Sequence, residues 1–293
     1  MWIGLAIASA VIFGIGSVVM KSATLRHCLD QHILFGLYLS GALIFLVTSG
    51  SSFYFHYDSK FVLFAFLVAI GSFSGNWAVI KALELGPASL TAPMLNMNLP
   101  LIILMSVVFY GESLDAIKIL VILCLLAGVV LVKVDPNERL VIKSRKWFLY
   151  VFLGAICLFL REGGLKITQE AGIHNPELLF VSYVMCIAFT CVTIFFISKK
   201  KKSNLPRERE NGNHRRKSVY YGVGAGLCSG VGLLCYSSAL TLGPTSLVAL
   251  IFSARSVVIV FFSYFIHKER LSILQVGALV LLTVGLALAS FSL

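Results

Sequence analysis

Ten apolar stretches follow one another along the chain, separated by short polar connections. They are residues 2–20, 32–51, 61–83, 88–110, 114–133, 147–168, 177–198, 218–240, 245–266 and 271–292. A helix needs about 20 apolar residues to cross the hydrocarbon core of a bilayer, and each stretch is close to that length. The pattern predicts an all-α integral membrane protein with ten transmembrane helices.

A nine-residue pattern occurs twice, as ALELGPASL at 82–90 and as ALTLGPTSL at 239–247. Each copy joins two apolar stretches. Gly86 and Gly243 suit the end of the first helix, where a positive φ favours glycine. Pro87 and Pro244 suit the first turn of the next helix, where the missing N–H is not needed. These four residues are predicted to form two equivalent structural turns.

The likeness between the two halves of the chain extends beyond these turns. A shift of 157 positions lays residues 61–133 over 218–290 without a gap, and a shift of 145 positions lays Trp2 on Trp147. A longer basic loop around 199–217 absorbs the difference between the two shifts. The sequence therefore indicates a duplicated unit.

The two repeats are predicted to cover residues 1–143 and 144–293, with five helices in each. Because five is an odd number, the second repeat must lie inverted in the membrane relative to the first. Inverted repeats place a substrate site near the bilayer midplane, where the two repeats meet.

The composition supports a membrane protein. Hydrophobic residues make up 58% of the chain and charged residues only 13%, and the mean hydropathy is +0.93. Soluble domains carry about 25% charged residues. The net charge of +11 does not indicate nucleic acid as a partner, because 19 of the 24 Lys and Arg residues fall in connections on one side of the predicted bundle. The positive-inside rule makes that side cytoplasmic in a multi-pass protein of the cytoplasmic membrane, and it places both termini outside. The basic segment Lys199–Lys217 also suits contact with anionic lipid.

Polar residues near the centres of apolar stretches are the candidates for substrate binding. The shift of 157 positions lays Asn96 on Ser253 and Asn98 on Arg255, so both halves carry polar residues at the same depth. These four residues are predicted to face a central cavity. Arg255 offers a planar fork suited to a carboxylate or phosphate. A structural ion pair between Arg255 and Glu162 is the alternative, and the two roles are compatible.

Six further residues complete the predicted site: Asn76, Trp77, Lys81, Arg161, Glu162 and Tyr236. A charge within a membrane helix is costly and usually faces a partner or water, which favours a role for Arg161 and Glu162. Lys81 lies near a helix end beside Glu84, so a mutually paired terminus is the alternative there. Packing is the alternative for the aromatic members of the set.

The paired turns, together with the segments Gly111-Glu112-Ser113-Leu114 and Lys268-Glu269-Arg270-Leu271, resemble the EamA family of the drug/metabolite transporter superfamily. The resemblance implies ten helices in two inverted repeats around a central cavity, and transport of metabolites, amino acids, nucleotide-related compounds or toxic solutes. Members of the family are often described with both termini inside the cell. The distribution of Lys and Arg in this chain predicts the opposite orientation. Relatives that exchange protons for cationic drugs carry an acid in the first helix. In this chain the position of that acid falls near Phe13, and the equivalent position in the second half is Leu158. Neither residue is acidic, which disfavours the exchange of protons for cationic drugs.

We therefore expect a secondary transporter that moves a small solute, favouring an amino-acid-like or other carboxylated or anionic one, by alternating access. The alternatives are an exporter of lipophilic or cationic drugs and a non-transporting receptor or scaffold. An embedded enzyme is disfavoured because the six histidines lie in loops or at helix ends. A cation channel is also disfavoured, because it would need intramembrane carboxylates, and the two such acids, Glu84 and Glu162, stand beside three basic residues. The sequence contains no phosphate-binding G-x₄-G-K-[ST] loop and no metal-ligand spacing, so no cofactor or metal is expected.

Overall fold

The computed structural model describes residues 1–50, 58–111, 142–200 and 212–267, together with isolated positions 116, 119, 120, 123, 277 and 280. All regular structure in these ranges is helical. The helices are α1 (Trp2–Leu25), α2 (Asp30–Ser49), α3 (Ser59–Leu85), α4 (Ala88–Leu95), α5 (Asn98–Tyr110), α7 (Lys146–Glu170), α8 (Asn175–Lys200), α9 (Gly212–Leu242), α10 (Thr245–Ser253) and α11 (Arg255–His267).

Within the described residues, eight helical spans are long and apolar enough to cross a membrane. They coincide with eight of the ten predicted stretches and extend most of them by a few residues. The predicted stretches 114–133 and 271–292 lie outside the described residues, apart from the six isolated positions named above. The protein is therefore a multi-pass, all-helical membrane protein.

Two of the eight spans are broken near their middle, which the apolar pattern did not predict. The span Ala88–Tyr110 divides into α4 and α5, and the span Thr245–Ile266 divides into α10 and α11. At the first break the amide N–H of Asn96 donates to the carbonyl of Pro93 at 3.1 Å, a tighter turn than an α-helix makes. Pro100 cannot donate to the carbonyl four residues before it, that of Asn96, which weakens the helix at this place.

The second break has the same shape without a proline. The amide of Ala254 donates to the carbonyl of Ile251 at 3.0 Å, and that of Val257 donates to the carbonyl of Ala254 at 3.0 Å. The shift of 157 positions relates Met97 to Ala254. The two halves of the chain are thus interrupted at equivalent positions.

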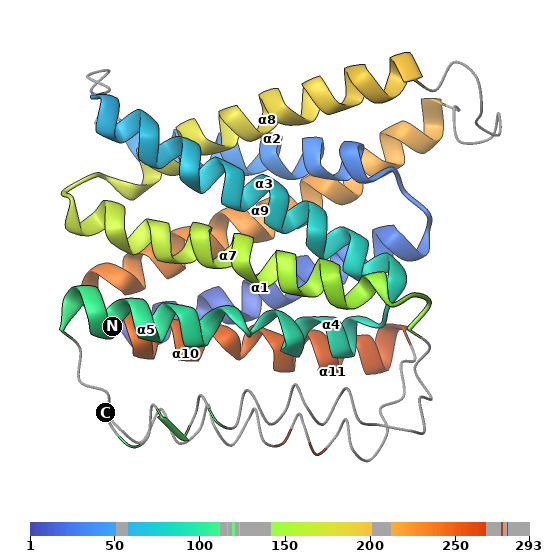
Figure 1. Cartoon of the computed structure of the whole chain (residues 1–293). Helices are drawn as coiled ribbons and strands as arrows, with labels where there is room; N and C mark the ends of the chain where they lie inside the picture. The colour runs from blue at the N-terminus through green and yellow to red at the C-terminus, as the bar shows by residue number, and fades with distance from the viewer. Residues whose placement is uncertain are drawn as a thin grey trace.

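The helices form a bundle in which α2 and α8 lie at one edge and the two broken spans lie at the other (Figure 1). Their packing partners come in matched pairs: α1 packs on α9 as α7 packs on α3, and α2 packs on α9 as α8 packs on α3. The broken spans lie side by side in opposite directions, because α4 contacts α11 and α5 contacts α10. Between these two edges, α1 and α7 lie against the broken spans (Figure 1).

The turns that contain Gly86 and Gly243 correct one prediction. Gly86 has φ −148° and ψ 174°, which is extended backbone, and neither glycine has a positive φ. Glycine is required for another reason. A Cβ on Gly86 would lie 2.5 Å from Nε1 of Trp147, and a Cβ on Gly243 would lie 2.6 Å from Cδ2 of Trp2. Each turn therefore packs on the tryptophan that begins the opposite half of the chain.

The prolines of these turns also differ slightly from expectation. Pro87 and Pro244 are the N-cap residues of α4 and α10, one position before the first helical turn. Each still begins the helix through its carbonyl: that of Pro87 accepts the amide of Thr91, and that of Pro244 accepts the amide of Val248, both at 3.0 Å. The fixed φ of proline suits this position as well as the next one.

Candidate functional site

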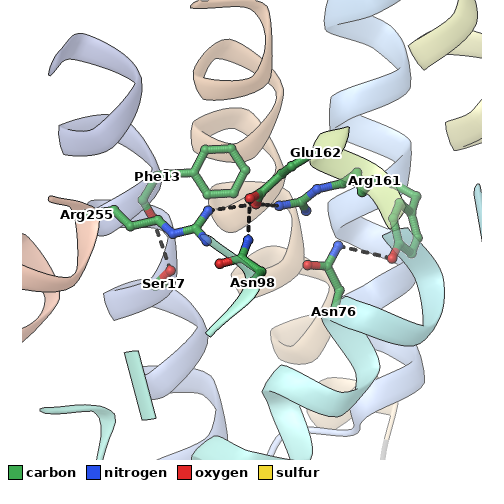
Figure 2. Close-up of polar contacts among 8 residues, drawn as sticks. Phe13, Ser17, Asn76, Asn98, Arg161, Glu162 and Arg255 are labelled. Carbon is green, nitrogen blue, oxygen red and sulfur yellow. Dashed lines mark hydrogen bonds and ion pairs between the residues drawn. The ribbon is translucent and has the colours of Figure 1, made fainter. Parts of the chain in front are cut away.

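A buried carboxylate joins three other residues at the centre of the bundle. Oε1 of Glu162 accepts from Nη2 of Arg161 and from Nη1 of Arg255, both at 2.9 Å. Oε2 accepts from Nδ2 of Asn98 at 2.6 Å. The two guanidinium groups approach the carboxylate from opposite sides (Figure 2). The alternative of an ion pair between Arg255 and Glu162 is thus what the structure contains.

This cluster is almost completely buried. Arg161 and Glu162 are each 1% exposed and Arg255 is 7% exposed. Two guanidinium groups and one carboxylate leave a net positive charge at the middle of the spans. A charge at the bilayer centre is costly and is found mostly where it meets a partner or a functional ligand. The cluster therefore carries one uncompensated positive charge at the centre of the bundle.

The helix breaks bring the members of the cluster together. Arg255 is the first residue of α11, and Asn98 is the first residue of α5. The side chain of Asn96 links the two breaks, since its Nδ2 lies 3.3 Å from the carbonyl of Ser253 and 3.2 Å from Oγ of Ser256. Polar residues that lie far apart in the sequence are consequently fixed at one depth.

Phe13 lies between the two arginines, a role the residue pattern alone did not indicate. The guanidinium carbon of Arg161 is 5.3 Å from the centre of its ring, and that of Arg255 is 5.9 Å away. The ring also meets Phe252 edge to face at 5.2 Å. The available signal was the comparison with cation-exchanging relatives, which placed their acid near this position. The face of an aromatic ring attracts cations, so Phe13 stabilises the two guanidinium groups beside it.

A cavity of about 50 Å³ adjoins the cluster. Its wall is mostly apolar, and its polar members are Ser17, Asn76, Arg161, Ser229 and Arg255. Neither Glu162 nor any other acidic side chain is among the described residues of the wall. The cavity therefore presents positive charge and neutral polar groups.

The cavity extends from the cluster toward one end of the bundle. Along α1 its wall runs from Phe13 to Met20, toward the side chain of Lys21. The same end holds the loop that begins α7, because the amide of Lys143 donates to the carbonyl of Leu85 at 2.8 Å. It also holds several of the basic connections that predict the cytoplasmic side.

The structure sorts the predicted site residues into three groups. Asn76, Arg161 and Arg255 line the cavity. Glu162 and Asn98 are buried and do not line the cavity: Glu162 accepts from both arginines, and Asn98 donates to Glu162. Asn96 and Ser253 were also predicted to face the cavity, but both are buried in contacts between the two breaks.

Three predicted residues lie away from the cavity. Trp77 packs edge to face on Tyr150 at 5.5 Å. Lys81 forms ion pairs with Asp30 and with Glu84, so the paired helix end is the correct interpretation there. Tyr236 is fully buried against Phe252, with ring centres 4.6 Å apart, so packing is its observed role.

The described part of the chain contains no group of three His, Cys, Asp or Glu residues that could hold a metal ion. The basic residues Lys199 and Arg215 to Lys217 are exposed beside the segment 201–211, which lies outside the described residues.

The fold and the cluster define a polytopic membrane protein with a small, positively charged cavity at its centre. The sequence matches the model of the EamA-like transporter family over residues 1–134 and 145–291, and the chain therefore belongs to that family. Members of this family are transporters rather than enzymes. The resemblance inferred from the paired turns is confirmed.

The fold is also found in a solved structure. One crystal structure, described only as "Crystal structure of protein", aligns with a TM-score of 0.63 over 97% of this chain and 96% of that chain, at 17% sequence identity. At that identity the likeness concerns the fold alone. No curated protein gives a significant match to the sequence.

Proposed function

We propose that this protein is a secondary transporter of the drug/metabolite transporter superfamily that moves a small carboxylated solute across the cytoplasmic membrane by alternating access. The observation that carries the proposal is the cavity wall, which presents Arg161 and Arg255 and, in its described part, no acidic side chain. A guanidinium group binds a carboxylate through two parallel hydrogen bonds, which suits recognition of such a solute.

The proposed architecture is two inverted five-helix repeats, residues 1–143 and 144–293. The matched packing pairs support it, because exchanging each described helix of the first half with its counterpart in the second maps nearly every helix contact onto another one, and only the contact between α2 and α3 lacks a clear counterpart. The opposed directions of the two broken spans also suit inversion.

Alternating access would involve movement of one repeat against the other about the cluster. The cavity reaches toward the basic end of the bundle, which supports a conformation that faces the predicted cytoplasm. Contacts at the other end include the bond from Nε2 of Gln169 to the carbonyl of Leu240 at 3.3 Å. These contacts would have to separate in the opposite conformation. Anionic lipid is proposed to contact the exposed basic residues at the start of α9.

Export of lipophilic cations is the second candidate, because Glu162 is a carboxylate at the bilayer midplane. The contacts of Glu162 disfavour cation export. Its Oε1 already accepts from Arg161 and Arg255, and its Oε2 accepts from Asn98. A cation would have to displace a guanidinium group from this carboxylate.

The proposal is tested with purified protein and the Arg255→Gln variant, screened by thermal shift against organic acids, amino acids, nucleotides and cationic drugs. A ligand that binds the native state raises its melting temperature. Carboxylated compounds are expected to stabilise the parent and not the variant, and to show saturable uptake in liposomes that contain the parent. Lys81→Gln is the matched control, because it also removes a cation from an ion pair but lies outside the cavity wall. Stabilisation by lipophilic cations alone would overturn the proposal.

A further inference from the structure

We propose that the central site takes a monocarboxylate that lacks an amino group, and that Arg161 is its principal contact. This inference rests on the proposed function and narrows it, because a carboxylated solute could equally be a zwitterionic amino acid or a dicarboxylate. Three independent properties of the site select the monocarboxylate: its net charge, its unpaired donors and its lack of a counterion for an ammonium group.

The net charge sets the charge of the ligand. Arg161 and Arg255 share the single carboxylate of Glu162, and all three side chains are at least nine-tenths buried. One positive charge is therefore left uncompensated. Burial of an unpaired charge is costly, so the bound state is most favourable with a ligand that carries one negative charge. A ligand with two negative charges would leave the site with one excess negative charge instead of leaving it neutral.

Unpaired donors identify the point of contact. Of the three guanidinium nitrogens of Arg161, only Nη2 donates to Glu162, whereas Nε and Nη1 have no hydrogen-bond partner among the described residues. Buried donors without a partner are rare in native proteins, and each requires an explanation. Arg161 lines the cavity, and Figure 2 shows its guanidinium group between Glu162 and Asn76. A carboxylate in the cavity would supply the missing acceptors.

The same wall offers no counterion for an ammonium group. Glu162 lies outside the described wall and already accepts three hydrogen bonds. The acidic residues Asp30 and Glu84 are engaged by Lys81, on α3 and outside the wall. The hydroxyl of Ser17 and the amide of Asn76 are neutral. A zwitterionic amino acid would therefore leave its ammonium group uncompensated beside two guanidinium groups.

The apolar part of the wall suits a short hydrocarbon chain. It includes Leu37, Val79, Leu158 and Ile259. The cavity of about 50 Å³ is roughly a third of an engineered apolar cavity that holds benzene, so it must widen around even a three-carbon ligand, and a short chain requires the least widening.

A three-carbon series separates the ligand classes on the intact protein. Propanoate, alanine, malonate and propylammonium are compared by thermal shift and by competition for uptake into liposomes. We expect the dissociation constant of propanoate for the parent to be about tenfold lower than that of alanine or malonate. Propylammonium should not bind. Arg161→Gln should lose propanoate binding, because it removes both the unpaired donors and the excess charge.

A change in selectivity gives the sharper test. Glu162→Gln removes the only carboxylate of the cluster, so two positive charges remain and malonate should become the preferred ligand over propanoate. If this variant does not fold, the series on the parent decides the question. Alanine binding as tightly as propanoate would overturn the inference and leave the proposed function intact. Failure of every carboxylate to bind the parent or to be transported would overturn the proposed function itself.

Discussion

At the residue scale, two glycines are selected by what lies against them. Gly86 packs on the indole of Trp147, and Gly243 packs on that of Trp2. The indole N–H of Trp147 also donates to Oγ1 of Thr91 at 3.0 Å, in the helix that begins just after the turn. The tryptophan is therefore held in place, and it leaves no space for a side chain on Gly86.

Gly86→Ala is expected to destabilise the protein by about 1–3 kcal/mol, the usual cost of overpacking a well-packed site. The new Cβ would lie 2.5 Å from Nε1 of Trp147, so the indole must shift and weaken its bond to Thr91. Thermal unfolding in detergent measures the effect. Gly4→Ala is the matched control, because open space surrounds its Cβ and alanine lowers the entropy of the unfolded chain. Equal melting temperatures for the two variants would contradict this explanation.

At the element scale, the close approach of α2 and α9 depends on small residues on one face of each helix. A Cβ on Gly222 would collide with the carbonyl oxygen of Ile33, and a Cβ on Gly36 would collide with that of Val219. The hydroxyl of Ser40 donates to the carbonyl of Val223 at 3.1 Å across the same contact. Small residues allow membrane helices to approach until their backbones touch.

Gly222→Ala should therefore force α2 and α9 apart and lower the melting temperature, by an amount that corresponds to about 1–3 kcal/mol. Gly224→Ala is two residues away on the same helix and is the control. Its Cβ would meet only Cγ1 of Val19, at 3.6 Å, which is ordinary contact. The Gly224 variant should be as stable as the parent in the same thermal assay. Similar losses in both variants would show that helix flexibility, and not the contact with α2, governs stability.

At the scale of the whole molecule, the cavity and the basic connections lie at the same end of the bundle. Lys21 donates to the carbonyls of Leu83 and Gly86 there, at 2.8 Å each, and His214 lies 3.0 Å from the carbonyl oxygen of His27. The first, third and seventh predicted connections therefore share one face. If the positive-inside rule holds, the cavity opens toward the cytoplasm.

The charge distribution predicts that both termini are outside. A cysteine that replaces exposed Arg215, in a background without other cysteines, should react with an impermeant reagent only after the cells are permeabilised. A tag on the N-terminus should be detected on intact cells. The reverse pattern would show that this chain follows the orientation in which the family is often drawn, and that its cavity faces outward.

The sequence by itself determined the class of the protein, because the cost of placing polar groups in a bilayer acts on every segment separately. The apolar stretches gave the described spans to within a few residues, and the repeated turn identified the family. Asn76, Arg161 and Arg255 could be selected from the sequence as residues of the cavity wall because a polar group at midspan is unusual wherever it occurs.

Only the tertiary structure decided which of those residues meet. Glu162 and Arg255 are 93 positions apart, and their contact depends on how two helices pack. The role of Phe13 was hidden because an aromatic residue is ordinary in a membrane helix until two guanidinium groups lie beside it. Gly86 likewise suggested a backbone requirement, whereas its neighbour Trp147 lies in the other half of the chain. Hydropathy is a property of each segment, but contact between segments is a property of the packed bundle.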